Sequence, residues 1–334
     1  MAVNIAINGF GRIGRLVARK LLTRSDVNLV AVNDLGDIKA GAHLFKYDSI
    51  HGTFQGDVAV ENDEIVVGGR RIKYLSQKDP ASLPWGDLGA QIVVESTGVF
   101  RSKEKAALHL QGGASKVIIT APAKGKVDLT MVMGVNHEQY TPDMSVVSNA
   151  SCTTNCLAPM AKVILEQFGI VYGMMNTVHS YTNDQRVLDL DHEDLRRARA
   201  AALSLIPTTT GAATAVGEVI PELKGKLDGL AIRVPTPNVS LCDFTFQSEK
   251  PVSAEALNQA FKTASAGALQ GILKYTELPL VSSDYNGEEN SCVVDGLLTM
   301  VMGDRMAKVI GWYDNEWGYS ARVADMVSYI GARL

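Results

Sequence analysis

The first half of the chain alternates short apolar runs with amphipathic segments. Apolar runs that predict strands lie at Val3 to Asn8, Leu29 to Asn33, Ile92 to Ser96, Val117 to Thr120 and Met131 to Val135. Amphipathic segments that predict helices lie between several of them, at Arg12 to Leu22 and Lys103 to Gln111. Because strands that alternate with helices form parallel sheets covered on both faces, this half is predicted to be a doubly wound α/β domain.

One segment interrupts this alternation. Between Asp57 and Leu75, short alternating runs such as Val58-Ala59-Val60 are separated by Asn62-Asp63 and Gly68-Gly69. Turn residues of this type between short strands predict β-hairpins, so the segment is expected to be an insertion of antiparallel strands.

The pattern changes after Ser151. A helix is predicted from Cys152 to about Phe168, followed by a strand from Ile170 to His179 and a polar stretch from Ser180 to Arg199. Only one further helix is obvious, at Ala254 to Ala266. Four further strands are predicted, at Leu230 to Val234, Ser240 to Gln247, Ser291 to Asp295 and Lys308 to Tyr313. Few crossover helices indicate a mostly antiparallel or mixed sheet, and hence a second α+β domain over 151–315.

The last segment of the chain predicts one more helix. Its apolar residues form a stripe along one side, at Tyr319, Val323, Met326, Val327 and Ile330. A stripe of this kind requires a partner surface on which it can be buried.

Composition narrows the class of protein. The chain has 334 residues, enough for two domains, and its net charge of −4 argues against a nucleic-acid surface, which is usually basic. Its four cysteines form no CxxC pair, so neither a disulfide framework nor a metal site is expected. No apolar run approaches the roughly 20 residues that a membrane span requires. We therefore expect a protein of the reducing cytoplasm.

A glycine motif joins the first predicted strand to the first predicted helix. Gly9, Gly11 and Gly14 have the G-x-G-x-x-G spacing, and Asp34 follows Gly14 by 20 residues. In Rossmann-type domains such glycines allow close approach of a pyrophosphate, and the acidic residue accepts hydrogen bonds from a ribose. The alternative is a glycine turn in which Asp34 caps a loop.

Cys152 is the candidate nucleophile. It lies at the predicted start of a helix among small polar residues, in the run Ser151-Cys152-Thr153-Thr154-Asn155. A helix N-terminus and a nearby imidazole, here His179, both lower a thiol pKa, so a reactive thiolate is expected. The alternative for Cys152 is a buried core thiol, which is the interpretation we prefer for Cys156.

Several cationic and hydroxyl residues could bind phosphate by charge-assisted hydrogen bonds. They are Thr182, Arg197, Thr208-Thr209-Thr210-Gly211 and Arg233. Each of them taken alone is more typical of a turn or a surface charge, and a histidine at a strand end, such as His179, is often merely hydrogen-bonded within a sheet.

Taken together, the motifs resemble phosphorylating glyceraldehyde-3-phosphate dehydrogenases over the whole chain. The resemblance rests on the segments 7–15, 148–156, 179–182, 195–199, 207–211, 233–237 and 312–319. It implies that Cys152 attacks glyceraldehyde 3-phosphate, that His179 takes the proton, and that hydride passes to NAD. Inorganic phosphate would then release 1,3-bisphosphoglycerate from the thioacyl enzyme.

The resemblance also implies roles for further residues. NAD would contact Gly9, Gly11, Arg12, Ile13, Gly14, Asp34, Thr97, Thr120, Asn315 and Tyr319, with Asn315 orienting the nicotinamide amide. The substrate phosphate would lie at Thr182 and Arg233, and the attacking phosphate at Ser151, Thr153, Arg197, Thr210 and Gly211.

At the level of the molecule, the resemblance implies an NAD-binding domain over 1–150, completed by a helix at 316–334. It further implies a homotetramer in which the segment 181–207 lies at subunit contacts. One departure from the family pattern is Leu190-Asp191, where many NAD-using members have Leu-Pro. Erythrose-4-phosphate dehydrogenase activity and a secondary binding role, to RNA or to a surface partner, remain alternatives.

Overall fold

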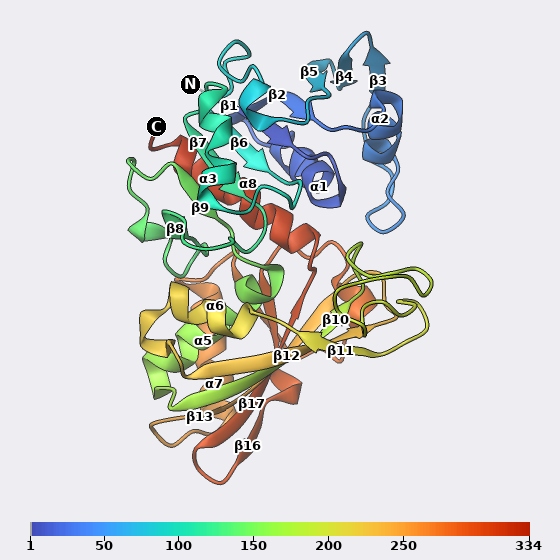
Figure 1. Cartoon of the computed structure of the whole chain (residues 1–334). Helices are drawn as coiled ribbons and strands as arrows, with labels where there is room; N and C mark the ends of the chain where they lie inside the picture. Colours follow the sequence, from blue (N-terminus) through green and yellow to red (C-terminus); the bar gives the residue numbers. More distant parts are fainter. Residues whose placement is uncertain (1) are drawn as a thin grey trace. The chain divides into compact units, whose positions relative to one another are not determined.

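The computed structural model describes residues 2–334, which group into two compact units (Figure 1). The first unit comprises 2–131, 138–150 and 320–334. The second comprises 132–137 and 151–319. Each unit has its own sheet and its own core, and the two are described separately.

The sheet of the first unit has nine strands in the order β3-β4-β5-β2-β1-β6-β7-β9-β8. The strands are β1 (Val3–Asn8), β2 (Val27–Asn33), β3 (Val58–Glu61), β4 (Glu64–Val67), β5 (Arg70–Leu75), β6 (Ile92–Glu95), β7 (Lys116–Ile119), β8 (Leu129–Thr130) and β9 (Val146–Ser148). All neighbouring strands from β5 to β8 in this order are parallel, whereas β3, β4 and β5 pair as antiparallel hairpins. The predicted Rossmann-type domain and its hairpin insertion are therefore confirmed.

The helices of this unit follow the strands. They are α1 (Arg12–Leu21), α2 (Ile38–Lys46), α3 (Lys103–Ala106) and α4 (Leu108–Gln111), and Figure 1 shows α2 beside the hairpin strands. Leu16 and Val17 on α1 are fully buried, as are Ile5 and Ile7 on β1, because the apolar face of α1 packs on the sheet.

Three features of the first half of the chain differ from the sequence predictions or were absent from them. Residues Met131 to Val135 form turns rather than a strand, since the Val132 N–H bonds the Asn136 side chain and Gly134 has φ +80°. The single predicted helix Lys103 to Gln111 is broken into α3 and α4. Helix α2 was not predicted, although Asp37 caps it by accepting from the N–H groups of Lys39 and Ala40.

The sheet of the second unit runs β11-β12-β10-β13-β17-β15-β14, with β16 paired to β17. The strands are β10 (Tyr172–Ser180), β11 (Ile206–Thr209), β12 (Leu227–Val234), β13 (Ser240–Gln247), β14 (Leu273–Thr276), β15 (Cys292–Asp295), β16 (Met300–Met302) and β17 (Met306–Tyr313). Only the pairs β10–β12 and β14–β15 are parallel. The predicted mostly antiparallel sheet is confirmed.

Helices α5 (Cys152–Phe168), α6 (Ala212–Val219) and α7 (Ala254–Ala266) pack on this sheet. The two predicted helices begin and end where the sequence indicated, whereas α6 was not predicted. Its eight residues, Ala212–Val219, are too few to show a clear helical period.

The last helix, α8 (Trp317–Gly331), buries its predicted apolar stripe. From Ser320 onward it belongs to the first unit, where Arg24 pairs with Asp325 and donates a hydrogen bond to Ser328, 2.8 Å away. The ring of Tyr329 also packs edge-on against Tyr140 in that unit.

Candidate active site

The glycine loop has the geometry of a close backbone turn. Gly9 has φ +93°, a conformation that favours glycine, and a Cβ there would lie 2.6 Å from the Thr97 nitrogen. A Cβ on Gly14 would collide with the carbonyl oxygen of Gly9. A Cβ added at Gly11 would have no atom of a more distant residue within 4 Å. This part of the loop is therefore open to the phosphate of a ligand.

Asp34 ties the glycine loop to the turn after β2. Its Oδ2 accepts a hydrogen bond from the Phe10 N–H at 2.7 Å, and its Oδ1 accepts from the Gly36 N–H at 2.8 Å. The loop-capping alternative therefore describes real contacts of Asp34. It does not exclude ribose binding, because each carboxylate oxygen can accept more than one hydrogen bond.

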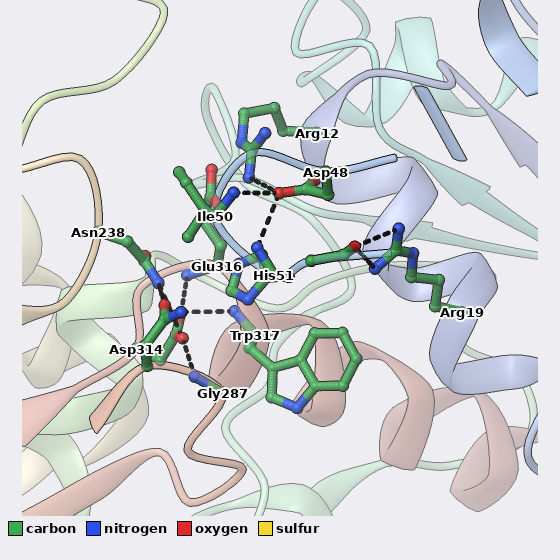
Figure 2. Close-up of polar contacts among 12 residues, drawn as sticks. Arg12, Arg19, Asp48, Ile50, His51, Asn238, Gly287, Asp314, Glu316 and Trp317 are labelled. Atoms are coloured by element: carbon green, nitrogen blue, oxygen red, sulfur yellow. Dashed lines mark hydrogen bonds and ion pairs between the residues drawn. The ribbon is translucent and has the colours of Figure 1, made fainter. Parts of the chain in front are cut away.

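Arg12, in the first turn of α1, is held by the loop that follows α2. Its Nη2 atom lies 3.2 Å from Asp48 Oδ1 (Figure 2). Burial opposes ionisation of Asp48, but the N–H groups of His51 and Ile50 and the charge of Arg12 outweigh it and lower its pKa to about 2. Arg12 is thus fixed at the opening of the glycine loop, and Ile13 beside it is half-buried.

A buried polar network lies at the carboxyl ends of the parallel strands. Strand register places Asn8 beside Glu95, whose carboxylate accepts from Asn8 Nδ2 at 2.6 Å and from the Thr97 N–H at 2.8 Å. His109 lies 2.9 Å from the same carboxylate, and its other ring nitrogen accepts from the Trp85 indole N–H at 3.0 Å. The sequence did not reveal this network.

The predicted cofactor residues Thr97 and Thr120 both contact this region of the sheet. Thr97 Oγ1 donates to the Glu95 carboxylate, and Thr120 Oγ1 donates to the Glu95 carbonyl at 3.2 Å. Their backbone positions, just beyond β6 and β7, are therefore set by the buried Glu95.

In the second unit, Cys152 begins helix α5. The Ser151 hydroxyl caps the helix by accepting from the Thr154 N–H at 3.0 Å. Ala150 just before it has φ +53°, which is uncommon for a residue with a side chain and marks a sharp turn. The turn leaves the Cys152 sulfur at the helix N-terminus, 3.5 Å from Nε2 of His179 at the end of β10.

The protonation state of His179 follows from its neighbours. Nδ1 lies 2.7 Å from the Ser180 carbonyl oxygen, which can only accept, so Nδ1 must carry the proton. Arg233 Nη1 also lies 3.0 Å from Nδ1, but it is a donor and its hydrogen bond goes to the same carbonyl, at 3.1 Å. The unprotonated Nε2 therefore faces the sulfur.

The predicted depression of the Cys152 pKa is wrong for this structure. Burial raises the pKa of the Cys152 thiol, and the charge of Arg233 offsets this only in part. Burial, reinforced by Arg233, also lowers the pKa of His179 to about 3. The pair consequently rests as a neutral thiol and a neutral imidazole.

The structure brings Thr182 and Arg233 together beside His179. Arg233 is the register neighbour of His179 in the pair β10–β12, and its Nη1 lies 3.4 Å from Thr182 Oγ1. Arg233 Nε is buried and bonds no acceptor within residues 2–334. These groups form a cationic pocket next to the thiol.

Arg197 lies in the loop between β10 and β11. Its guanidinium donates to Asp184 Oδ2 at 2.6 Å, to Thr208 Oγ1 at 2.9 Å and to the Thr209 carbonyl at 3.2 Å. The predicted cation is thus held beside the threonine segment at 208–210.

The first turns of α5 and α6 meet at Thr154 and Ala212. Thr154 Oγ1 donates to the Ala212 carbonyl at 3.4 Å, and Thr210 Oγ1 accepts from the Ala212 N–H at 3.1 Å. Two helix N-termini at one place favour an anion.

Thr153 is held by Tyr313, to which the sequence analysis assigned no role. Its hydroxyl lies 2.8 Å from the buried Tyr313 hydroxyl, which lies 2.8 Å from Thr177 Oγ1 as well. The Tyr313 ring also meets the His179 ring edge-on, with centroids 6.0 Å apart.

The loop that carries Asn315 is fixed by its neighbour Asp314 (Figure 2). Asp314 Oδ1 accepts from the N–H groups of Glu316 and Trp317, and Oδ2 accepts from Asn238 Nδ2 and the Gly287 N–H, all within 2.7 to 2.9 Å. Asn315 and Tyr319 are both buried.

The segment Leu190-Asp191, where the chain departs from the family pattern, is exposed. The Asp191 carbonyl accepts from Arg186 at 2.8 and 3.0 Å, while the residue as a whole is exposed. It lines a hollow of about 780 Å³ together with Arg186, Asp189, Leu195 and Arg199.

The described residues offer neither a metal site nor a membrane-spanning helix. Within residues 2–334, no three or more His, Cys, Asp or Glu side chains are grouped so that they could hold a metal ion. In the same part of the chain, every helix is too short or too polar to cross a membrane.

Comparison with known proteins agrees with these observations. Residues 3–103 match the family described as glyceraldehyde 3-phosphate dehydrogenase, NAD binding domain, and residues 151–315 match its C-terminal domain. Glyceraldehyde-3-phosphate dehydrogenase of Geobacillus stearothermophilus is 60% identical over 100% of this chain and 99% of its own length. Glyceraldehyde-3-phosphate dehydrogenase 1 of Bacillus subtilis is 58% identical over 100% of this chain and 99% of its own length. Glyceraldehyde-3-phosphate dehydrogenase of Zymomonas mobilis is 54% identical over 100% of both chains. The chain belongs to the glyceraldehyde-3-phosphate dehydrogenase family, and its first domain is the NAD-binding domain of that family.

Proposed function

We propose that this protein converts D-glyceraldehyde 3-phosphate, NAD and inorganic phosphate into 1,3-bisphosphoglycerate. The observation that carries the proposal is the pairing of Cys152 Sγ with the unprotonated Nε2 of His179, 3.5 Å apart at a helix N-terminus. Such a pair can form a bond to an aldehyde carbon and retain the oxidised product as a thioester.

His179 acts as the general base in this scheme. As Cys152 Sγ bonds the aldehyde carbon, the thiol proton passes to Nε2, while Nδ1–H remains bonded to the Ser180 carbonyl. Because both groups start neutral, the proton is transferred during attack rather than before it. Bound NAD supplies the hydride acceptor, and Gly9, Gly11, Gly14 and Asp34 fit its pyrophosphate and ribose.

Two anion sites complete the proposal. Arg233 and Thr182 bind the substrate phosphate, which gives the buried Arg233 Nε an acceptor. Arg197 with the N-terminal turns of α5 and α6, including Ser151, Thr153, Thr210 and Gly211, binds the attacking phosphate. Both sites hold anions by charge-assisted hydrogen bonds, which position them for reaction.

We further propose a homotetramer. Tyr172, Met174, Met302 and Met306 line a hollow of about 870 Å³ on the second sheet and are 47 to 72% exposed. Val187, Leu188, Leu195 and Leu203 in the loop after β10 are 71 to 83% exposed. Two separate apolar surfaces of this kind support two kinds of contact between copies.

NAD is the proposed preferred cofactor, and the cytoplasm the proposed location. Asp34 would repel the additional phosphate of NADP, and Asp191 would add a second carboxylate if its loop reaches the ribose in a partner subunit. The four cysteines are all free thiols, as a reducing compartment would leave them.

A steady-state assay tests the activity. Glyceraldehyde 3-phosphate or erythrose 4-phosphate is supplied with NAD or NADP, with phosphate present or omitted. We expect turnover with glyceraldehyde 3-phosphate, NAD and phosphate, and none for Cys152→Ser, whose weaker nucleophile should still leave NAD binding intact. Preference for erythrose 4-phosphate without dependence on phosphate would refute the proposal.

A further inference from the structure

Asn315 is held by two serines to which the sequence analysis assigned no role. Ser180 follows His179 at the end of β10, and Ser240 begins β13. Each serine hydroxyl lies 2.8 Å from the same atom, Asn315 Oδ1. All three side chains are buried, with Ser180 and Ser240 0% and 1% exposed.

Counting donors and acceptors fixes the orientation of the amide. Ser240 Oγ accepts from the Ser180 N–H at 3.1 Å, so its own proton must go elsewhere. Within residues 2–334 neither hydroxyl has an acceptor closer than Oδ1. Turning the amide over would present Nδ2 to the serines and leave at least one buried hydroxyl proton without a good acceptor, which is costly.

The opposite end of the amide is therefore a donor. Both hydrogen bonds of the Asn315 side chain within residues 2–334 are made by Oδ1, so Nδ2 is left to donate to a hydrogen-bond acceptor on a bound molecule. A nicotinamide carboxamide offers one such acceptor, its oxygen.

We propose that Ser180 and Ser240 are positioning residues that hold Asn315 with Nδ2 directed at the carboxamide oxygen of NAD. This inference rests on the proposed function, because it presupposes that Asn315 meets the nicotinamide.

Ser180 also links Asn315 to the general base, His179. Its carbonyl accepts from His179 Nδ1, and its hydroxyl donates to Asn315. One residue thus orients both the general base and the cofactor contact. A side-chain substitution at Ser180 removes only the second of these bonds, since the carbonyl is retained.

The experiment measures binding as well as turnover. Dissociation constants are determined by calorimetry for NAD, for its 3-acetylpyridine analogue and for ADP-ribose. The analogue has a carbonyl acceptor but no amide N–H, and ADP-ribose has no nicotinamide at all. The variants are Ser180→Ala, Ser240→Ala, their combination, and each of these with Asn315→Ala.

Ser248→Ala is the matched control. Ser248 is another fully buried serine, just beyond the other end of β13, and its hydroxyl contacts the carbonyls of Lys250 and Arg305 instead. It should leave all three dissociation constants within about twofold, the scatter expected away from a binding site.

With both serines replaced, we expect NAD binding to weaken by about tenfold, the effect of one hydrogen bond. Binding of the acetylpyridine analogue should weaken further, because a turned amide finds no donor on it, while ADP-ribose binding stays within about twofold. Asn315→Ala should cost less in the double-serine background than in the wild type.

Equal weakening of NAD binding and of ADP-ribose binding would show that the serines have a merely structural role. Additive effects of the serine substitutions and Asn315→Ala would also overturn the inference. Failure of the proposed function is distinguishable, since it would appear in the wild type as absent NAD binding or absent turnover.

Discussion

At the scale of single residues, burial decides the charge of the reacting groups. Cys152 lies at a helix N-terminus near an arginine, yet the loss of hydration raises the pKa of its thiol. The same effect lowers the pKa of His179 to about 3. A sequence motif indicates which groups are neighbours, but it contains no information on how deeply they are buried.

The depressed pKa of His179 predicts a pH dependence of stability. An unfolded histidine titrates near 6.5, so between pH 6.5 and 3 the unfolded state binds the proton more readily. Stability should therefore fall as pH is lowered through this window, at up to about 1.4 kcal/mol per pH unit from this residue. His179→Gln removes that contribution.

Urea unfolding of the wild type and His179→Gln at pH 6.5, 5.5 and 4.5 measures the difference. The wild type should lose more free energy of unfolding than the variant with each step. His43→Gln, at an exposed histidine of the first unit, is the control and should follow the wild type. Parallel losses in wild type and His179→Gln would contradict the assignment.

Arg233 provides a second prediction at this scale. Replacing Arg233 by Leu should reduce kcat/KM for glyceraldehyde 3-phosphate by about 10- to 100-fold, corresponding to a charge-assisted hydrogen bond of roughly 1.5–3 kcal/mol. The loss on unphosphorylated glyceraldehyde should be much smaller, because that substrate has no anion. Initial rates with both aldehydes test this, with Arg71→Leu, at an exposed arginine of the first unit, as control. Equal losses on both aldehydes would remove Arg233 from the phosphate site.

At the scale of elements, the turn after β2 and the glycine loop form one unit through Asp34. Asp34→Gly should relax the preference for NAD only in part, and Asp34→Gly with Asp191→Ser should relax it further, since both carboxylates would act on one phosphate. The single variant should also lower thermal stability, because the N–H groups of Phe10 and Gly36 lose their acceptor.

Ratios of kcat/KM for NAD and NADP, together with melting temperatures, measure both effects. A wild-type enzyme with equal kcat/KM for NADP and NAD would contradict the proposed preference for NAD. A double variant no better with NADP than Asp34→Gly would show that Asp191 lies away from the cofactor.

The elements that could be predicted from the sequence are those with a sustained hydrophobic periodicity or with characteristic residues at their ends. Helices α5 and α7 and strand β13 were placed at their observed bounds because each has a sustained pattern. Helix α6 is short, and the apolar run at Met131 to Val135 has the composition of a strand but turns at Gly134. In these cases tertiary contacts override local pattern.

The site was predictable where residues lie close together in the chain or match a family motif. Cys152, His179 and Arg233 were proposed in this way. Tyr313 and Ser240 were not, because their contacts join residues 60 to 160 positions apart. The Glu95–His109–Trp85 network was missed because its members come from β6, from α4 and from the turn before β6, and only the tertiary fold brings them together.

At the scale of the whole molecule, the open face of the second sheet should be a contact between copies. Met302→Glu, with Met302 72% exposed, should dissociate the proposed tetramer into smaller species, because burying an unpaired carboxylate in an apolar interface is costly. Light scattering after size-exclusion chromatography measures the mass. Leu278→Glu, at a 60% exposed leucine of a surface loop, should leave the assembly unchanged. An unchanged mass for Met302→Glu would place the contact elsewhere.

If the proposed tetramer forms through these exposed methionines, stability should depend on protein concentration. If their surface is covered only by another copy, association contributes to the folded state by mass action, and dilution withdraws that contribution. The melting temperature should then rise with the logarithm of subunit concentration, and enzyme stored dilute should lose activity faster than enzyme stored concentrated. A newly made chain would face the same condition, being least stable before it first meets another copy.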